Sequence, residues 1–402
     1  MQTVEYNKNK TVPDIYLNLS HFLDHFVMLI FAKAAYDAAK YFNYTYEQFI
    51  IYGLFGFVLF GGMAPIAAYL ADKYSRSVLM VIFHFGIGIS AISAGLSNSP
   101  GQLATSIGFI GIFASIYHPV GIAMLIQNNK KIGLRLGING VYGNMGVAAA
   151  PLITGIFLTY GSWSACFIFP GLACLFYGVI FFRSLNPNGP IDVLKKKTSS
   201  GNFAPHWLRV LIALVITTCS GGFIFGSMTF FVPRYFEISM GNITSSVLLT
   251  GILASIVYAI ASLAQILVGW LIDRFSPKLI LLLIGIGQFI CISLSSIVTD
   301  LTLFLVMILA MGFVFGQIPI TDTILSRYVP DVHRSKILSV KFLLNLSVGA
   351  LVLPVSSIML KSGFEMSSLF SVLGFIAILV IISAVFLPTQ KRSERLDLYP
   401  KS

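Results

Sequence analysis

The sequence predicts an all-α integral membrane protein with twelve transmembrane helices in two pseudo-symmetric six-helix bundles. Three observations predict this fold class. Hydrophobic residues make up 56% of the chain and charged residues only 10%, whereas soluble domains carry roughly 25% charged residues. Long apolar segments recur along the whole chain. A short charged loop occurs twice, half of the 402-residue chain apart, which indicates two repeated halves.

Each apolar segment is long enough to cross a bilayer. Crossing the hydrocarbon takes about 20 apolar residues, and a backbone in lipid needs the internal hydrogen bonds of a helix. A membrane β-barrel would need alternating segments of about ten residues, which this sequence lacks. We expect helices at 15–38, 47–71, 77–95, 102–127, 136–160 and 163–182, and then at 207–232, 244–272, 278–298, 301–326, 337–360 and 366–387.

A polar, basic and turn-rich segment separates the two sets of six helices. It contains three prolines, a run of three lysines and a Ser-Ser-Gly-Asn sequence, a composition typical of a linker. We therefore expect a first bundle at 1–183, a cytoplasmic linker at 184–206, and a second bundle with its tail at 207–402.

The positions of the basic residues predict the orientation. If both termini are cytoplasmic, most of the 26 Lys and Arg residues fall on the cytoplasmic side, as the positive-inside rule requires. We expect a multi-pass protein of the inner (plasma) membrane with both termini in the cytoplasm. The net charge of +11 then reflects topology and contact with anionic lipid, so we expect no nucleic-acid partner. We also expect the chain to be a monomer.

The repeated loop joins an apolar helix to an acid and two bases in each half. The first copy contains Asp72, Lys73 and Arg76. The second copy, with Asp273, Arg274 and Lys278, has the same order of charges. This pattern resembles motif A of the major facilitator superfamily. The resemblance implies a transporter that works by alternating access, in which the two loops latch one conformation at the cytosolic face.

The first helix carries the densest set of polar side chains expected inside the membrane. His21, Asp24 and His25 lie three and four residues apart, so they share one face of a helix. A charge in hydrocarbon costs at least ~2.5 kcal/mol, which favours a watery cavity. In the resembled family, helices 1, 4, 7 and 10 line such a cavity, and many drug and proton antiporters carry an acid in helix 1. We expect Asp24 to be a protonation site, influenced by both histidines.

Structural alternatives and one metal-binding alternative remain open for these residues. Asp24 and His25 would also be explained as a satisfied polar pair. The three side chains His21, Asp24 and His25 would also suit an ion such as zinc or ferrous iron, since imidazole and carboxylate are ligands of those ions. His118, which precedes a proline in the fourth helix, is expected in the cavity or in a structural hydrogen bond to a carbonyl.

Two further cavity residues are expected in the second half. Aligning Gly108-Phe109 with Gly312-Phe313 places Asp322 opposite His118 in the internal repeat. Lys341, in the eleventh helix, is either a cavity residue or a lysine that reaches the cytosolic surface.

Two short motifs resemble the fosmidomycin-resistance-like and drug:proton antiporter branch of the same superfamily. They are the polar stretch at 21–24 and the Tyr-His-Pro-Val-Gly sequence at 117–121. The glycine-rich stretch at 140–155 loosely resembles antiporter motif C, although helix packing explains it equally well. The motif B arginine of the antiporters is missing, because residues 102–127 contain no arginine.

The sequence therefore predicts a proton-coupled secondary transporter that exports a small organic solute and uses no cofactor. The alternatives are a proton-coupled importer of a nutrient or metabolite, a metal or metal-chelate transporter that uses the histidines and the acid of the first helix, and a passive facilitator. The chain contains no G-x-S-x-G, H-E-x-x-H or P-loop pattern, so we expect neither an enzyme nor an ATP-driven pump.

Overall fold

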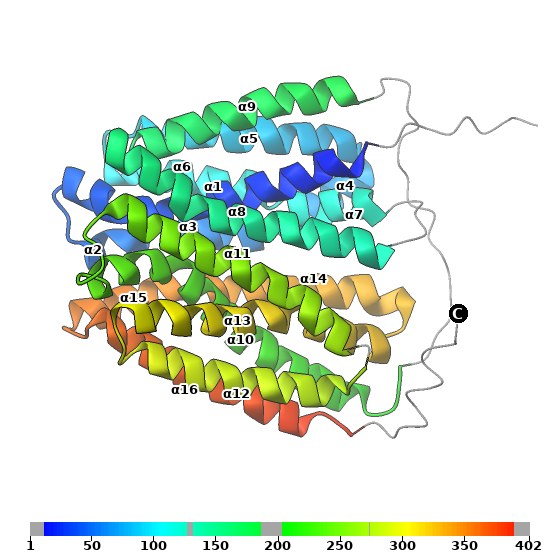
Figure 1. Ribbon diagram of the computed structural model, residues 1–402. Helices are drawn as coiled ribbons and strands as arrows, with labels where there is room; N and C mark the ends of the chain where they lie inside the picture. The colour runs from blue at the N-terminus through cyan, green and yellow to red at the C-terminus, as the bar shows by residue number, and fades with distance from the viewer. Residues whose placement is uncertain (1–11, 127–131, 186–202, 273, 390–402) are drawn as a thin grey trace, which may run out of the picture. The chain divides into compact units, whose positions relative to one another are not determined.

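The computed structural model describes four stretches of the chain, 12–126, 132–185, 203–272 and 274–389. Every regular element within these stretches is a helix (Figure 1). Twelve of the described spans are long and apolar enough to cross a membrane. These findings confirm the predicted all-α membrane fold.

In the first half, single helices form the first, third, fifth and sixth spans, whereas the second and fourth are built from shorter pieces. The elements are α1 (Asp14–Tyr41), α2 (Tyr46–Phe49), the 3₁₀-helix η1 (Ile50–Gly53), α3 (Leu54–Gly62), α4 (Ala64–Lys73), α5 (Arg76–Gly95), α6 (Pro100–Ala114), the π-helical turn η2 (Tyr117–Gly121), α7 (Ile122–Ile126), α8 (Ile132–Tyr160) and α9 (Ala165–Ser184).

In the second half only the eleventh span is divided, by a break at Leu351. The elements are α10 (Trp207–Ser239), α11 (Val247–Ile272), α12 (Pro277–Ser295), α13 (Asp300–Tyr328), α14 (Asp331–Ala350), α15 (Val352–Lys361) and α16 (Met366–Phe386).

The largest difference from the expected boundaries lies at the end of α10. The expected helix stops at Val232, the residue before Pro233. The structure continues the helix through Pro233 to Ser239. Buried side chains in this extension, Tyr235 and Phe236, explain why the helix persists, since packing compensates for the hydrogen bond that a proline removes.

The chain divides into two compact units, each of which is considered by itself. Within the described residues, the first unit comprises those up to 185 together with 229–259 and 353–362. The second unit comprises 203–228, 260–352 and 363–389. The end of α10, the start of α11 and most of α15 thus pack with the first half of the chain. The division into bundles at 1–183 and 207–402 stays a prediction, and most of the expected linker lies outside the described residues.

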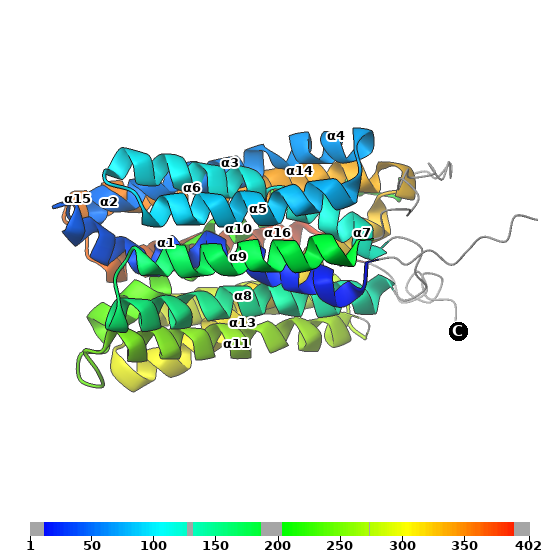
Figure 2. The same cartoon turned by 90° about the horizontal axis from the view of Figure 1, so that it is seen from above.

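Close packing of α1 against α8 organises the first unit (Figure 1, Figure 2). A Cβ atom at Gly146 would lie 2.2 Å from the carbonyl oxygen of Phe22, and one at Gly143 would lie 2.6 Å from the ring of His21. Only glycine permits this approach of the two helices. The glycine-rich stretch of the fifth span therefore serves helix packing, one of its two interpretations.

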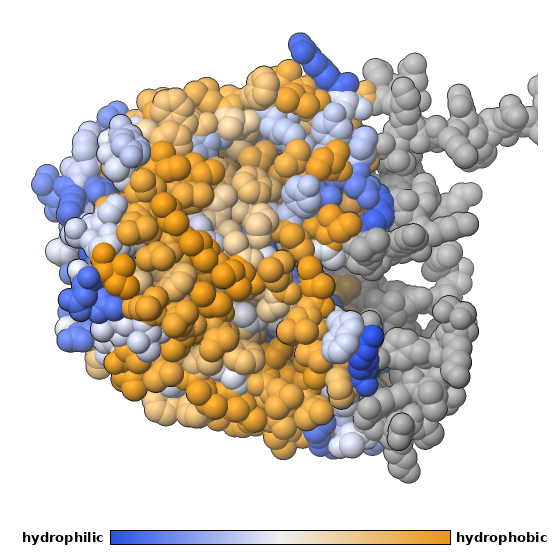
Figure 3. Space-filling view, viewed as in Figure 1, coloured by the Kyte–Doolittle hydropathy of each residue, from blue (hydrophilic) through white to orange (hydrophobic). Residues whose placement is uncertain are grey.

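The second unit has an apolar core where α12 packs against α13 and α16. Ile280 and Ile284 of α12 meet Ile320 of α13 and Val380 of α16 there. In both units, large apolar side chains also lie exposed along the helices, for example Ile89 and Leu267. On the face that Figure 3 shows, hydrophobic residues cover the middle of the surface and hydrophilic residues gather toward the helix ends. Such a surface suits contact with acyl chains.

Candidate functional site

A π-helical turn holds His118 in place. The turn η2 contains Pro119, which lacks the backbone N–H of a regular helix; such turns are frequent at functional sites. The neighbouring Tyr117 hydroxyl donates a hydrogen bond to the Leu17 carbonyl oxygen at 3.0 Å and accepts one from Asn139 Nδ2 at 2.8 Å. These two bonds tie η2 to α1 and to α8, so the position of His118 relative to α1 is well defined.

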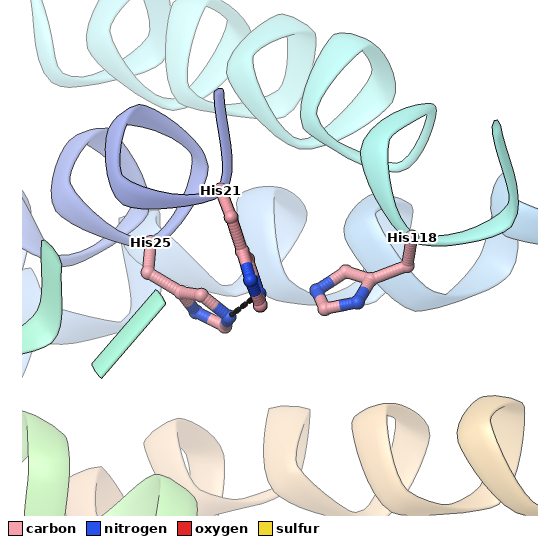
Figure 4. A group of neighbouring side chains, drawn as sticks. All are labelled: His21, His25 and His118. Atoms are coloured by element: carbon pink, nitrogen blue, oxygen red, sulfur yellow. Dashed lines mark hydrogen bonds between the residues drawn. The ribbon is translucent and has the colours of Figure 1, made fainter. Parts of the chain in front are cut away.

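The three histidines His21, His25 and His118 face one another, and together with Asp24 we call them the histidine cluster (Figure 4). His21 Nε2 lies 3.1 Å from His25 Nε2. One ring nitrogen from each of the three histidines lies within 4.8 Å of the other two. The structure thus brings together the three residues expected in the first helix and the histidine expected in the fourth.

The tautomer of His21 follows from its other nitrogen. Nδ1 lies 2.8 Å from the carbonyl oxygen of Asn139. Because a carbonyl oxygen only accepts hydrogen bonds, Nδ1 carries the hydrogen, and in the neutral ring Nε2 is the bare nitrogen. His21 therefore presents a lone pair to His25. The ring of His21 is also stacked on Tyr117, with 4.7 Å between ring centroids, which fixes its plane.

Asp24 is fully buried beside these rings. Its Oδ2 atom lies 3.5 Å from His118 Nε2, and neither carboxyl oxygen accepts a hydrogen bond from any described residue. A buried carboxyl group without hydrogen bonds is costly. The histidine cluster therefore contains an acid whose two oxygens could still accept hydrogen bonds or coordinate an ion. The role of Asp24 as a protonation site stays a prediction.

A second buried polar group lies further along α1, and we call Lys33, Arg234, Glu237 and Thr250 the paired-charge cluster. Lys33 forms an ion pair with Glu237 of α10 and donates a hydrogen bond to Thr250 Oγ1 of α11 at 3.0 Å. Arg234 Nη1 donates to the other oxygen of Glu237 at 2.7 Å. Lys33 itself is buried. All of these residues belong to the first unit.

More charges surround the paired-charge cluster. The guanidinium of Arg234 lies 3.5 Å from the ring centroid of Tyr36, and Lys40 Nζ lies 4.1 Å from the same centroid. Asp37 interacts electrostatically with Lys33 and Glu237. Arg234 and Glu237 are absent from the expected cavity residues, because both lie beyond the expected end of the helix at residue 232. The sequence does contain one signal for this pair: a base and an acid three residues apart lie on the same face of a helix and can form an ion pair.

The other two expected cavity residues, Asp322 and Lys341, form an ion pair with each other in the second unit. Lys341 Nζ also donates to Thr321 Oγ1 at 2.7 Å. The side chain of Asp322 is 53% exposed, so this pair is more open than the paired-charge cluster. The expected relation between Asp322 and His118 stays a prediction.

The two charged loops are described only in part. Asp273 and the side chain of Asp72 lie outside the described residues. In the first loop Lys73 lies over the ring of Tyr69 and Arg76 is buried.

In the second loop Arg274 lies over the ring of Trp270. Lys278 Nζ donates to the carbonyl oxygens of Val385 at 2.9 Å and Leu387 at 2.6 Å, at the end of α16. A lysine there favourably meets the negative end of the helix dipole. The latch itself stays a prediction.

Several curated relatives share part of the sequence. The chain is 25% identical over 248 residues to the multidrug resistance protein MdtG of Yersinia enterocolitica. The aligned region covers 60% of this chain and 59% of the relative. It is 26% identical over 235 residues to MdtG of Escherichia coli O6:K15:H31, covering 56% of each. It is 30% identical over 110 residues to the puromycin resistance protein pur8 of Streptomyces alboniger, covering 27% of this chain and 22% of that protein. The chain thus spans less than two thirds of the length of these relatives.

Solved transporter structures share the fold. A bacterial homolog of the human lysosomal transporter Spinster, in an inward-facing and unoccupied conformation, aligns with a TM-score of 0.72 and 16% identity over 93% of this chain and 95% of that one. A point mutant of the nucleoside transporter NupG aligns with a TM-score of 0.73 and 13% identity over 93% of this chain and all of that one. At such identities the likeness concerns the fold alone.

The family model of the Major Facilitator Superfamily matches residues 17–316 and 236–400. Together with the multidrug resistance relatives, this match agrees with the drug:proton antiporter-like branch that the sequence motifs resemble. The chain therefore belongs to the Major Facilitator Superfamily and has the multi-pass membrane fold of that family.

Proposed function

We propose that this transporter exports a small organic solute across the inner membrane in exchange for protons. Export is supported by the multidrug and puromycin resistance proteins among its relatives. In this proposal the chain acts as a monomer with both termini in the cytoplasm and with no nucleic-acid partner, and it works by alternating access. The observation that carries the proposal is the pair of buried polar groups on one membrane-spanning helix.

The two groups lie on either side of the middle of α1. Asp24 and Lys33 are nine residues apart in a helix that runs from Asp14 to Tyr41, which corresponds to about 13 Å along the axis. Transporters of this kind bind cargo and coupling ions near the middle of the bilayer. Ionisable side chains at that depth are expensive to bury and usually functional. We assign the histidine cluster to the cargo and the paired-charge cluster to the coupling proton.

We assign the coupling proton to Glu237 in place of Asp24, the acid that the sequence predicts for this role. The Glu237 carboxylate holds Lys33 and Arg234 at the same time, with Asp37 and Lys40 nearby on α1. A proton on Glu237 would cancel its attraction to both cations and loosen the connection among α1, α10 and α11. Protonation would thereby shift the balance between two conformations, as a coupling ion must.

The histidine cluster is suited to the polar end of a cargo molecule. Its imidazoles offer both donors and acceptors, and Asp24 offers two acceptor oxygens that no described residue uses. A cargo group that pairs with them would remove the cost of burying that carboxyl. The predicted cavity role of these residues is therefore part of the proposal.

Puromycin is the probe for the test, because one relative is a puromycin resistance protein. Inverted membrane vesicles that contain the transporter are given an acidic interior, and uptake of radioactive puromycin is measured. We expect accumulation that a protonophore abolishes and that Glu237→Gln loses. Glu365→Gln, which removes an exposed acid in the second unit, is the matched control and should retain it.

Two results would overturn the proposal. Puromycin uptake that ignores the proton gradient in wild-type vesicles would indicate a passive facilitator. Gradient-driven uptake only in right-side-out vesicles would indicate an importer.

A further inference from the structure

We propose that His21, His25 and His118 bind one divalent transition-metal ion of the zinc class. This inference names the cargo class of the histidine cluster: a metal ion, or an organic molecule that carries one. As a statement about cargo it rests on the proposed transport function. As a statement about binding it stands on the geometry of the three rings alone (Figure 4).

The first argument is the spacing of two nitrogens. In a tetrahedral zinc site with Zn–N bonds of about 2.0–2.1 Å, neighbouring ligand nitrogens lie about 3.3 Å apart. His21 Nε2 and His25 Nε2 lie 3.1 Å apart. The two rings, one helical turn apart on α1, therefore need little movement to share one ion. The hydrogen bond between them would be replaced by two metal–nitrogen bonds.

The second argument is the hydrogen bond behind His21. Histidines that bind metals usually donate their other ring N–H to a carbonyl or carboxylate, which fixes the tautomer and orients the ring. The Nδ1 atom of His21 donates to the Asn139 carbonyl oxygen at 2.8 Å, so Nε2 is free of hydrogen and directed into the cluster. Stacking on Tyr117 holds the ring in that orientation.

The third ligand is a side chain that can adjust. The ring centroid of His118 lies 5.2 Å from that of His21 and 5.4 Å from that of His25. Closing the remaining gap takes rotation of the His118 side chain about its own bonds. The main chain of η2 stays where the two hydrogen bonds of Tyr117 hold it, so the ring turns on a fixed backbone.

The fourth argument is the buried carboxyl of Asp24. It accepts no hydrogen bond from the described residues and lies 3.5 Å from His118 Nε2. A divalent ion beside it would supply the positive charge that the cluster lacks. Three imidazoles with one carboxylate favour zinc, cobalt or nickel, whereas magnesium and calcium prefer oxygen ligands alone. The same ion thus explains both the convergent rings and the buried acid.

The binding test uses the full chain, purified without a histidine tag, and cobalt(II) as a coloured substitute for zinc. We expect one cobalt ion per chain with the visible absorption of a tetrahedral site, and displacement by one equivalent of zinc. His118→Ala and His25→Ala should abolish the absorption. Asp24→Asn should weaken the affinity by about 10- to 100-fold, as loss of a neighbouring carboxylate does at other metal sites.

His333→Ala is the matched control, because His333 is an exposed imidazole in the second unit. Its loss should leave the cobalt absorption unchanged. Absence of tetrahedral cobalt absorption in the wild type, or its persistence in both His25→Ala and His118→Ala, would overturn the inference. Circular dichroism of each variant shows whether it is folded, and His118→Gln provides a second, milder substitution.

The transport test separates the two forms of cargo. Radioactive zinc is supplied to inverted vesicles alone or with the organic chelator 8-hydroxyquinoline. Gradient-driven uptake that His118→Ala loses would support the inference, with zinc alone identifying the free ion and a requirement for chelator identifying the complex. If cobalt fails to bind while puromycin uptake persists, the metal site is refuted and the exporter proposal stands.

Discussion

The two polar groups on α1 differ in how their charges are satisfied. In the paired-charge cluster, Lys33, Arg234 and Glu237 each have an oppositely charged partner, and the contacts join three helices. In the histidine cluster, Asp24 is fully buried, yet its carboxyl oxygens accept no hydrogen bond from the described residues. The comparison shows that the charges of the paired-charge cluster are matched within the protein in this conformation. The histidine cluster has a buried carboxyl group that a bound ligand would pair with.

The largest expected effect comes from removing one partner of the buried ion pair. We expect Lys33→Ala to lower the stability of the first unit by about 3–5 kcal/mol, because the two acids Glu237 and Asp37 then lose a buried cation and share Arg234. Thermal unfolding in lipid nanodiscs measures the change. The double variant Lys33→Met/Glu237→Met removes one charge of each sign but also takes away the ion-pair partner of Arg234, so it should recover only part of the loss. A single variant as stable as the wild type would show that the pair is not buried in the folded protein.

A smaller but more selective effect is expected at the contact between α1 and α8. A Cβ at Gly143 would lie 2.6 Å from the ring of His21, so Gly143→Ala should displace that ring. Overpacking of this kind costs about 1–3 kcal/mol. Cobalt binding should weaken, while proton-driven uptake of puromycin should still depend on Glu237. Gly137→Ala is the control in the same helix, since a Cβ there meets no neighbouring atom. Equal cobalt affinity in both variants would contradict the account.

Loss of the Tyr117 hydroxyl should have a moderate effect on the histidine cluster alone. Tyr117→Phe removes the donor to the Leu17 carbonyl and the acceptor for Asn139, which leaves buried polar groups unsatisfied at a cost of about 1–3 kcal/mol. We expect a lower melting temperature and weaker cobalt binding. Retention of both wild-type values would mean that η2 is held by other contacts.

The smallest effect is expected at the ion pair of the second unit. The side chain of Asp322 is 53% exposed, and exposed pairs contribute about 0–1 kcal/mol. Asp322→Asn should therefore change the melting temperature little. Destabilisation as large as that of Lys33→Ala would remove the distinction between open and buried pairs.

Local sequence signals predict the members of the histidine cluster, whereas Arg234 and Glu237 of the paired-charge cluster are missed. The positions of His21, Asp24 and His25 within one helix reveal their common face, and the proline after His118 marks an irregular turn. The partners that complete the groups come from distant parts of the chain. The contact with His21 is made by the backbone carbonyl of Asn139, which residue identity does not reveal. Glu237 is missed because it follows Pro233, and a proline on its own favours the end of a helix. Packing of Tyr235 and Phe236 overrides that local signal.

The twelve spans are predicted well because hydropathy and length reflect the solvent directly. The membership of the compact units depends instead on which helix ends meet, and hydropathy and length do not encode that. Residues 229–259 belong to the second half of the sequence but pack with the first unit. No periodicity or composition within that stretch encodes such a contact.

The most direct test of the central claim compares two variants in two assays. The account predicts that Glu237→Gln abolishes the dependence of puromycin uptake on the proton gradient but retains tetrahedral cobalt binding. It predicts that His118→Ala loses cobalt binding while uptake of puromycin, if reduced, still responds to the gradient. Loss of both properties in each folded variant would contradict the assignment of cargo and coupling to separate groups on α1.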